Sequence, residues 1–163
     1  MILYCDTSAL IKRYVEEDRS DEVDGLWEEA VGVVTSTVAF AETVATFRRK
    51  YREGVLSEIG YIQTVAEFKS EYPRLILVPI SSELNRIIEE LLLKYPLRGF
   101  DAIHLASALL IHKGSDLGTR FACFDDVLNK AAEEERLDVP FLKAKFWKRS
   151  SGHPEMWDVL DPS

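Results

Sequence analysis

Four acidic residues occupy positions in this sequence that suit a catalytic or metal-binding carboxylate. Asp6 and Asp125 each follow directly after a short apolar run. Glu42 falls among apolar residues at helical spacing, and Asp101 opens an apolar helical pattern after a turn. Four carboxylates in one place would repel one another strongly unless cations held them. Together the four acids therefore indicate a cage for a metal ion.

The residue types of such a cage favour particular ions and a particular chemistry. Its donors are carboxylate oxygens, with no cluster of Cys or His around them, and this set suits Mg²⁺ or Mn²⁺ better than Zn²⁺. Ions of this kind activate water and neutralise charge on a leaving oxygen in phosphoryl and phosphodiester chemistry. The pattern predicts a metal-dependent enzyme that acts on a phosphoester.

Each acid also has an ordinary local explanation. Asp101 and Asp125 fit the N-cap position of a helix, and Thr7 or Ser8 fits the same role for the first helix. Glu42 shares a predicted helical face with Val38, Ala41 and Ala45, where a lone buried carboxylate is costly. Either that helix turns Glu42 to the rim, or the carboxylate pairs with an Arg, or a cation neutralises it.

Strands and helices alternate along the chain, which predicts an α/β fold with a mainly parallel sheet and helices on both faces. A parallel sheet collects ligands at the carboxyl ends of its strands, where Asp6 and Asp125 are expected. The run 75–80 is bounded by prolines and predicts a buried strand. The predicted strands are 2–5, 31–36, 75–80, 121–124 and 139–142, and the predicted helices are 8–15, 21–30, 38–52, 57–71, 81–94, 101–112 and 126–136.

Length and composition fit one domain with a substantial core. The chain has 163 residues, of which 47% are hydrophobic. We expect the domain to span residues 1–142, followed by an aromatic and charged tail, 143–163, that packs on the domain or lies at an interface. Two cysteines, Cys5 and Cys123, in apolar surroundings are expected to be buried free thiols. Neither a signal peptide nor a membrane-spanning run is recognisable, so we expect a soluble cytoplasmic protein.

The net charge of −8 argues against broad non-specific binding to nucleic acid, but it leaves room for a local basic groove. Several basic residues lie near the expected edge of the sheet. We take four of them as candidates for contact with a phosphate backbone: Lys12, Arg13, Arg48 and Arg49.

Four stretches of the sequence resemble PIN-domain ribonucleases, and most closely their VapC-type toxin branch. The resemblance covers about residues 1–142, in the order and approximate spacing of that family. The first and third stretches are the more specific ones. The four are Asp6-Thr7-Ser8-Ala9-Leu10, Glu42 in a helix after the second strand, Asp101-Ala102-Ile103-His104-Leu105-Ala106-Ser107-Ala108, and Phe124-Asp125-Asp126-Val127-Leu128-Asn129-Lys130-Ala131-Ala132.

This resemblance implies a three-layer α/β/α fold, dependence on Mg²⁺ or Mn²⁺, and cleavage of single-stranded or loop RNA. Asp6, Glu42 and Asp101 match the main metal ligands of the family, and Asp125 matches its more variable fourth acid. Ser8 matches a small polar residue that helps to orient a ligand or water. The resemblance also implies products with 5′-phosphate and 3′-hydroxyl ends, a small antitoxin as partner, and a homodimer.

One position departs from the family pattern, and several tempting residues have ordinary explanations. Cys123 stands where relatives often have Thr or Ser, and a thiol is the poorer hydrogen-bond donor. His104 lies one helical turn after Asp101, but the resemblance assigns it no general catalytic role, so we expect a packed core histidine. Three aromatic residues are expected in the core or at a subunit contact: Tyr14, Trp27 and Phe40.

Two other functions compete with the ribonuclease. A haloacid-dehalogenase-like phosphatase also begins with an Asp at a strand end and carries a later Asp pair, here Asp125-Asp126. That fold needs a second Asp two residues after the first, where this chain has Ser8. The other alternative is a PIN-like module that binds RNA or protein without cleaving it, since a fold does not guarantee chemistry.

Overall fold

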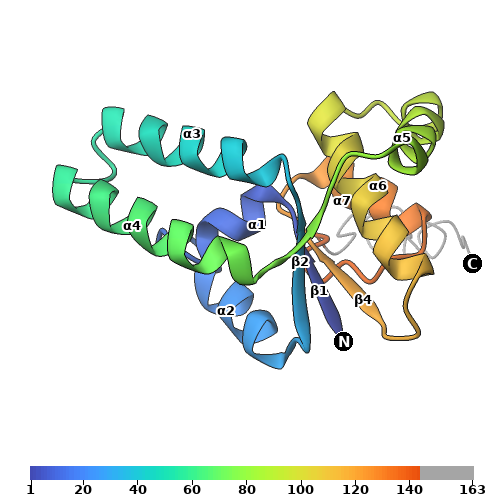
Figure 1. The fold of residues 1–163 in the computed structure, drawn as a ribbon, viewed down its shortest axis with the longest axis horizontal. Coiled ribbons are helices and arrows are strands. Elements are labelled where there is room, and N and C mark those ends of the chain that lie inside the picture. The colour runs from blue at the N-terminus through green and yellow to red at the C-terminus, as the bar shows by residue number, and fades with distance from the viewer. Residues whose placement is uncertain (144–163) are drawn as a thin grey trace, which may run out of the picture.

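The computed structural model describes residues 1–143. These residues fold around a central parallel sheet (Figure 1). The sheet of this part has four strands in the order β3-β2-β1-β4, so β1 is central and pairs with β2 on one side and β4 on the other. The predicted mainly parallel α/β fold is confirmed. The strands are β1 (Ile2–Cys5), β2 (Gly32–Ser36), β3 (Ile76–Val78) and β4 (Thr119–Ala122).

Helices cover both faces of the sheet, which gives the expected three layers. Side chains of β1 alternate between the two cores: Tyr4 packs with α5, α6 and α7, while Leu3 and Cys5 pack with α1 to α4. The alternation explains why this strand is apolar throughout. The helices are α1 (Thr7–Lys12), α2 (Ser20–Glu29), α3 (Ala39–Arg52), α4 (Glu58–Glu71), α5 (Ser82–Lys94), α6 (Gly99–Lys113) and α7 (Asp126–Glu134), with a short 3₁₀ helix η1 (Tyr72–Arg74).

Helices α3 and α4 form a hairpin that projects from the sheet (Figure 1). Gly54 makes the turn after α3 with φ +76°, a backbone conformation that glycine adopts without strain. Ser57 then caps α4, because its hydroxyl accepts the N–H of Gly60 at 3.0 Å. The rings of Tyr51 and Tyr61 stack across the hairpin with centroids 5.2 Å apart.

Two strand predictions are wrong in detail. Residues 139–142 do not form a strand: in the described part of the chain, pairing beyond β4 is a single bridge between Arg120 and Asp138. Pro140 has no N–H to donate, which disfavours a longer ladder. The run 75–80 forms only the three-residue strand β3, at the edge of the sheet, and Ile76 is 49% exposed rather than buried. Pro79 follows directly and ends the pairing.

The two cysteines are buried free thiols, as predicted. Burial raises the pKa of both thiols, so neither is a ready thiolate. None of the helices in residues 1–143 is long and apolar enough to cross a membrane. The predicted tail lies outside the described residues except for Lys143, whose amine contacts Asp126 at 2.9 Å.

Candidate active site

A pocket of about 330 Å³ at the carboxyl edge of the sheet brings all four predicted acids together. The backbone N–H of Asp6 donates to the carbonyl of Ala122 at 3.1 Å, which joins the ends of β1 and β4. The sheet therefore does place acids from distant parts of the chain at one edge, as expected. The pocket is lined by Asp6, Thr7, Ser8, Ile11, Glu42, Thr46, Arg49, Arg98, Asp101, His104, Phe124 and Asp125.

Asp6 is the most enclosed of the four acids, with 6% of its surface exposed. Its Oδ1 accepts the N–H of Ala9 at 3.0 Å, so Asp6 itself caps α1, and the predicted cap by Thr7 or Ser8 is wrong. Ser8 instead donates its hydroxyl to Asp6 Oδ1 at 2.7 Å and accepts the N–H of Phe124 at 2.9 Å. Burial raises the pKa of Asp6 despite these hydrogen bonds and the nearby His104.

Glu42 lies in the first turn of α3, with 26% of its side chain exposed. The predicted face is wrong, because Ala41 and Ala45 are exposed and α3 buries Ala39, Thr43 and Phe47 instead. The helix does turn Glu42 toward the rim, as the first of the three explanations required. Its Oε2 accepts hydrogen bonds from Thr7 Oγ1 at 2.7 Å and from His104 Nε2 at 2.8 Å.

The pKa of Glu42 reflects that setting. Partial burial alone would raise it, but the hydrogen bonds from His104 and Thr7 and the charge of Arg98 outweigh burial and lower it. Glu42 is therefore stabilised as a carboxylate, whereas burial disfavours the charge of Asp6. The two acids share a pocket in opposite electrostatic situations.

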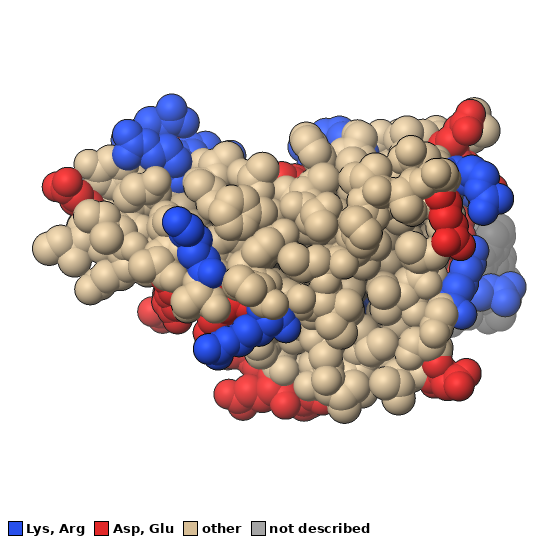
Figure 2. All heavy atoms as spheres, viewed as in Figure 1, with Lys and Arg blue, Asp and Glu red and all other residues tan. Residues whose placement is uncertain are grey.

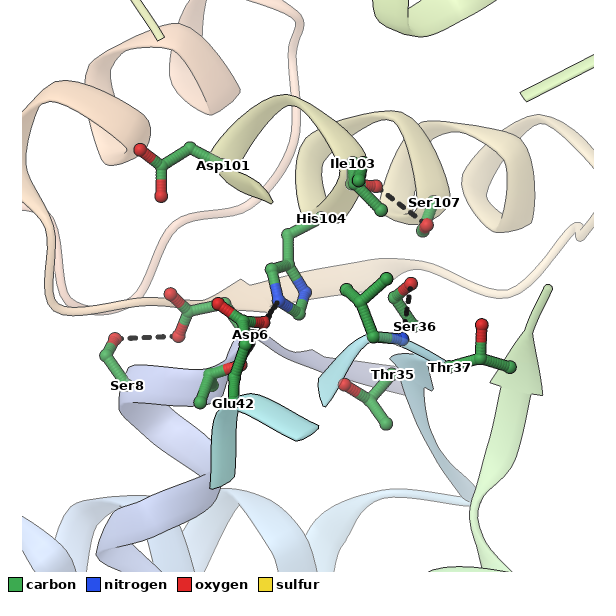
Figure 3. A network of polar contacts seen from close by, with 12 residues as sticks. Asp6, Ser8, Thr35, Ser36, Thr37, Glu42, Asp101, Ile103, His104 and Ser107 are labelled. Atoms are coloured by element: carbon green, nitrogen blue, oxygen red, sulfur yellow. Dashed lines mark hydrogen bonds and ion pairs between the residues drawn. The ribbon is translucent and has the colours of Figure 1, made fainter. Parts of the chain in front are cut away.

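His104 is buried as predicted, but its ring is tied to the site. Its Nδ1 lies 3.0 Å from the hydroxyl of Tyr4, and its Nε2 contacts both Glu42 and Thr7, at 2.8 and 3.2 Å. Figure 3 shows the ring pointing from α6 at Glu42. Sequence reasoning missed this role. The available signal was a polar residue at a buried position of an apolar helix, one turn after Asp101.

Asp101 and Asp125 form the other side of the pocket, where Arg98 joins them. Arg98 Nε lies 2.8 Å from Asp101 Oδ2, and its Nη2 lies 3.8 Å from Asp125 Oδ2. Asp101 is the third residue of α6 and not its N-cap, a position that Arg98 holds. Asp125 does cap α7, as predicted, by accepting the N–H of Leu128 at 2.8 Å. In Figure 3, Asp101 stands apart from Glu42 and points away from His104.

The structure brings one of the four predicted RNA contacts to the pocket. Arg49 lines it, from the outer part of α3. Arg48 lies over the stacked rings of Tyr51 and Tyr61 in the hairpin. Lys12 and Arg13 are engaged elsewhere, with Lys12 contacting Glu17 at 3.1 Å and Arg13 contacting Asp24 at 3.4 Å. Arg98, which sequence reasoning did not select, is the second basic residue of the pocket.

Cys123 supports the backbone at the end of β4. Its Sγ accepts the N–H of Asp125 at 3.2 Å, a bond that a Thr or Ser hydroxyl could also accept. The departure from the family pattern therefore preserves the acceptor at this position and loses only the stronger donor.

A family model described as PIN domain matches residues 3–134. The chain belongs to the PIN domain family. Membership confirms the resemblance noted in the sequence and leaves the phosphatase alternative without support.

Curated relatives of this PIN protein are ribonucleases by name. Ribonuclease VapC45 and Ribonuclease VapC49, both from Mycobacterium tuberculosis, are each 27% identical over 131 residues, covering 80% of this chain and 89% of theirs. Those names agree with the VapC-type branch that the sequence motifs indicated.

Solved structures share the fold. A VapBC2 structure from Rickettsia felis, bound to a DNA fragment from its promoter, matches with TM-score 0.60 and 12% identity over 85% of this chain and 97% of that chain. VapC20 from Mycobacterium tuberculosis, described as a sarcin-ricin loop cleaving toxin, matches with TM-score 0.55 and 19% identity over 79% and 94%. At such identities these matches show a common fold.

The pocket of this PIN domain offers the kind of donor atoms that a divalent cation prefers. All four acids supply hard carboxylate oxygens, and two hydroxyls stand beside them. As they stand, no three His, Cys, Asp or Glu side chains within residues 1–143 are close enough to hold one ion together. Because Arg98 engages Asp101 and Asp125, a cation shared by the whole pocket requires that guanidinium to move aside.

Proposed function

We propose that this PIN protein is an endoribonuclease of the VapC type that depends on Mg²⁺ or Mn²⁺. The observation that supports it best is the convergence of Asp6, Glu42, Asp101 and Asp125 in one pocket at the carboxyl edge of the sheet. Helix capping accounts for Asp6 and Asp125, but Glu42 and Asp101 cap none of the described helices and still line the same pocket. The names of the curated relatives point to the same activity.

Each residue of the pocket has a part in this proposal. Asp6, Glu42 and Asp101 would hold the cation, and Asp125 would hold a second ion or its water. The chemistry that a bound Mg²⁺ or Mn²⁺ supplies is activation of water and neutralisation of charge at the phosphate. Ser8 fixes the Asp6 carboxylate by its 2.7 Å hydrogen bond.

The basic residues of the pocket would bind the RNA backbone. Arg49 and Arg98 line the same cavity as the acids, so a phosphate drawn to them would lie beside the carboxylates. A guanidinium suits this task because its fork of N–H donors matches phosphate oxygens. The overall charge of −8 then restricts RNA binding to this local site.

The test is digestion of a single-stranded oligoribonucleotide and of an RNA stem-loop, with Mn²⁺ or with EDTA. We expect cleavage by the parent with Mn²⁺, none with EDTA, and strong loss in Asp6→Asn and Asp101→Asn. Asp21→Asn is the matched control, since Asp21 is an exposed acid of α2, outside the pocket. Undiminished cleavage in both pocket variants contradicts the proposed site. A parent that binds RNA but leaves it intact would favour the non-catalytic module.

We further propose that the protein is the toxin of a toxin–antitoxin pair and that it forms a homodimer. Neighbours of the same fold include a toxin–antitoxin complex from Klebsiella pneumoniae, which matches with TM-score 0.54 and 18% identity over 74% of this chain and 84% of that chain. An acidic pocket is suited electrostatically to a basic segment of a partner. Co-purification with the product of an adjacent small reading frame tests the pair, and sedimentation of the purified protein tests the dimer. A monomer that is harmless to its host while cleaving RNA contradicts both.

A further inference from the structure

His104 is a buried polar side chain of α6 that lines the pocket. It is 2% exposed, yet both nitrogens of its ring have partners. Tyr4, on the other side of the ring, is completely buried in the central strand β1. A chain of hydrogen bonds therefore runs from the core of the sheet, through the imidazole, to the carboxylate of Glu42.

The partners determine where the hydrogens lie. Glu42 is a carboxylate and only accepts, so the hydrogen between it and the ring belongs to His104 Nε2. Thr7 gives its own hydroxyl hydrogen to the same oxygen, Glu42 Oε2. In the neutral ring Nδ1 is then an acceptor, and the Tyr4 hydroxyl donates to it. Burial raises the pKa of Tyr4 well above its ordinary value, so that hydroxyl keeps its hydrogen.

We propose that His104 is a positioning residue for Glu42, held in one tautomer by Tyr4, an inference that rests on the ribonuclease proposed above. Both hydrogen bonds to Glu42 end on Oε2. This fixes the carboxylate with its second oxygen, Oε1, left for a cation. Such supporting groups behind a metal ligand set its orientation, and losing one typically weakens metal binding by about 10- to 100-fold.

A second histidine of the same helix shows that packing alone does not require this arrangement. His112 lies eight residues further along α6, and its buried Nδ1 has no hydrogen-bond partner among the described residues. It also lies outside the pocket. His112 is therefore the natural control for replacing a histidine in α6.

The experiment measures Mn²⁺ affinity by calorimetry on the full 163-residue chain, without RNA, together with thermal unfolding of the metal-free protein. We expect His104→Leu to weaken Mn²⁺ binding about 10- to 100-fold. His104→Gln should recover most of the affinity, because its amide N–H₂ can donate to Glu42. Tyr4→Phe keeps the ring and loses only the hydroxyl, so it should weaken binding less than His104→Leu does. His112→Gln should bind as the parent does.

Two results would overturn the proposal. One is a folded His104→Leu variant with parental Mn²⁺ affinity or, if that variant does not fold, Tyr4→Phe and His104→Gln variants that both bind as the parent does. The other comes from nitrogen NMR of the metal-free protein, if the ring hydrogen of His104 lies on Nδ1 rather than on Nε2. A parent that binds no Mn²⁺ and cleaves no RNA instead contradicts the proposed function itself, so the two failures are distinguishable.

Discussion

The two sides of the pocket hold their acids by different means. On the inner side, Asp6 and Glu42 receive hydrogen bonds from hydroxyls, a backbone N–H and an imidazole. On the outer side, Asp101 and Asp125 face one guanidinium, that of Arg98. The partners of the acids also differ in exposure: the side chain of His104 is 3% exposed, whereas that of Arg98 is 79% exposed.

This difference separates a fixed half of the site from an exchangeable one. Directed hydrogen bonds between buried groups hold a carboxylate in one orientation. Breaking them is costly, because it leaves buried polar atoms without hydrogen-bond partners. An exposed ion pair contributes little, about 0 to 1 kcal/mol, and another cation can replace it. The inner side is thus organised before any ion binds, while the outer side is merely neutralised.

The largest expected effect comes from the inner side. Asp6→Asn should lower RNA cleavage about 100-fold or more, because it removes the charge at the most enclosed ligand position. The fold should survive, since Asn also caps helices and the buried charge is lost. Single-turnover cleavage assays and thermal unfolding measure the two effects. Loss of cleavage together with loss of folding would instead assign Asp6 a structural role.

On the outer side, Asp125→Asn should lower cleavage less, by about tenfold. Asn can still cap α7 by accepting the N–H of Leu128, so stability should stay within about 0.5 kcal/mol of the parent. The control is Asp126→Asn, which changes the neighbouring acid that pairs with Lys143 outside the pocket. Equal losses in Asp6→Asn and Asp125→Asn would abolish the distinction between the two sides.

Arg98 is the counter-ion of Asp101 and Asp125 within the pocket. Removing its charge should have a smaller effect than the losses above, and it should strengthen metal binding rather than weaken activity. Arg98→Gln frees Asp101 and Asp125 of two ion pairs worth about 0.2 to 1 kcal/mol each, so Mn²⁺ should bind roughly 2- to 30-fold more tightly in calorimetry without RNA. Arg49→Gln is the control, because Arg49 lines the pocket but its ion pair is with Glu53. Unchanged or weaker Mn²⁺ binding in Arg98→Gln would mean that the outer side is not exchangeable.

The smallest effect is a pH dependence of stability. Burial raises the pKa of Asp6, so its contribution to stability is fully present below the pKa of the unfolded chain, about 3.9, and is lost as pH rises through the higher folded pKa. The metal-free parent should therefore lose stability relative to Asp6→Asn as pH rises above about 4, until it passes the raised pKa of the folded protein. Thermal unfolding of both proteins across that range measures it. A difference that does not grow with pH contradicts the raised pKa.

Sequence patterns predicted most of the fold because they report local physics. Strand β1 is apolar throughout because its side chains point alternately into the two cores. Ser57 and Ser81 mark the starts of α4 and α5, because their hydroxyls accept the first free N–H groups of these helices. The patterns failed at 139–142, where apolar residues resemble a strand but Pro140 limits pairing. They also misjudged the buried face of α3, because α1 and α4 pack against it and determine its rotation.

The short range of sequence patterns also explains why the acids of the pocket were predicted and the roles of Arg98 and His104 were not. Asp6 and Asp125 were recognisable because each follows an apolar run, a feature of a few consecutive residues. Arg98 lies only three residues before Asp101. Its contact with Asp125, and the contact of His104 with Glu42, 62 positions apart, instead join distant parts of the chain. No local pattern encodes such a distance.

The sequence by itself determined the α/β class, the order of most elements, the buried thiols and the four acids that share a pocket. Residue type and spacing suffice for these, because hydrophobic periodicity and strand-end position are short-range properties. Only the tertiary structure decided how each acid is held: which oxygen of Glu42 is tied, which guanidinium neutralises Asp101, and which acid is buried. Those outcomes depend on crossovers that bring α1, α3 and α6 to one edge of the sheet, and their packing sets the distances on which hydrogen bonds and ion pairs depend.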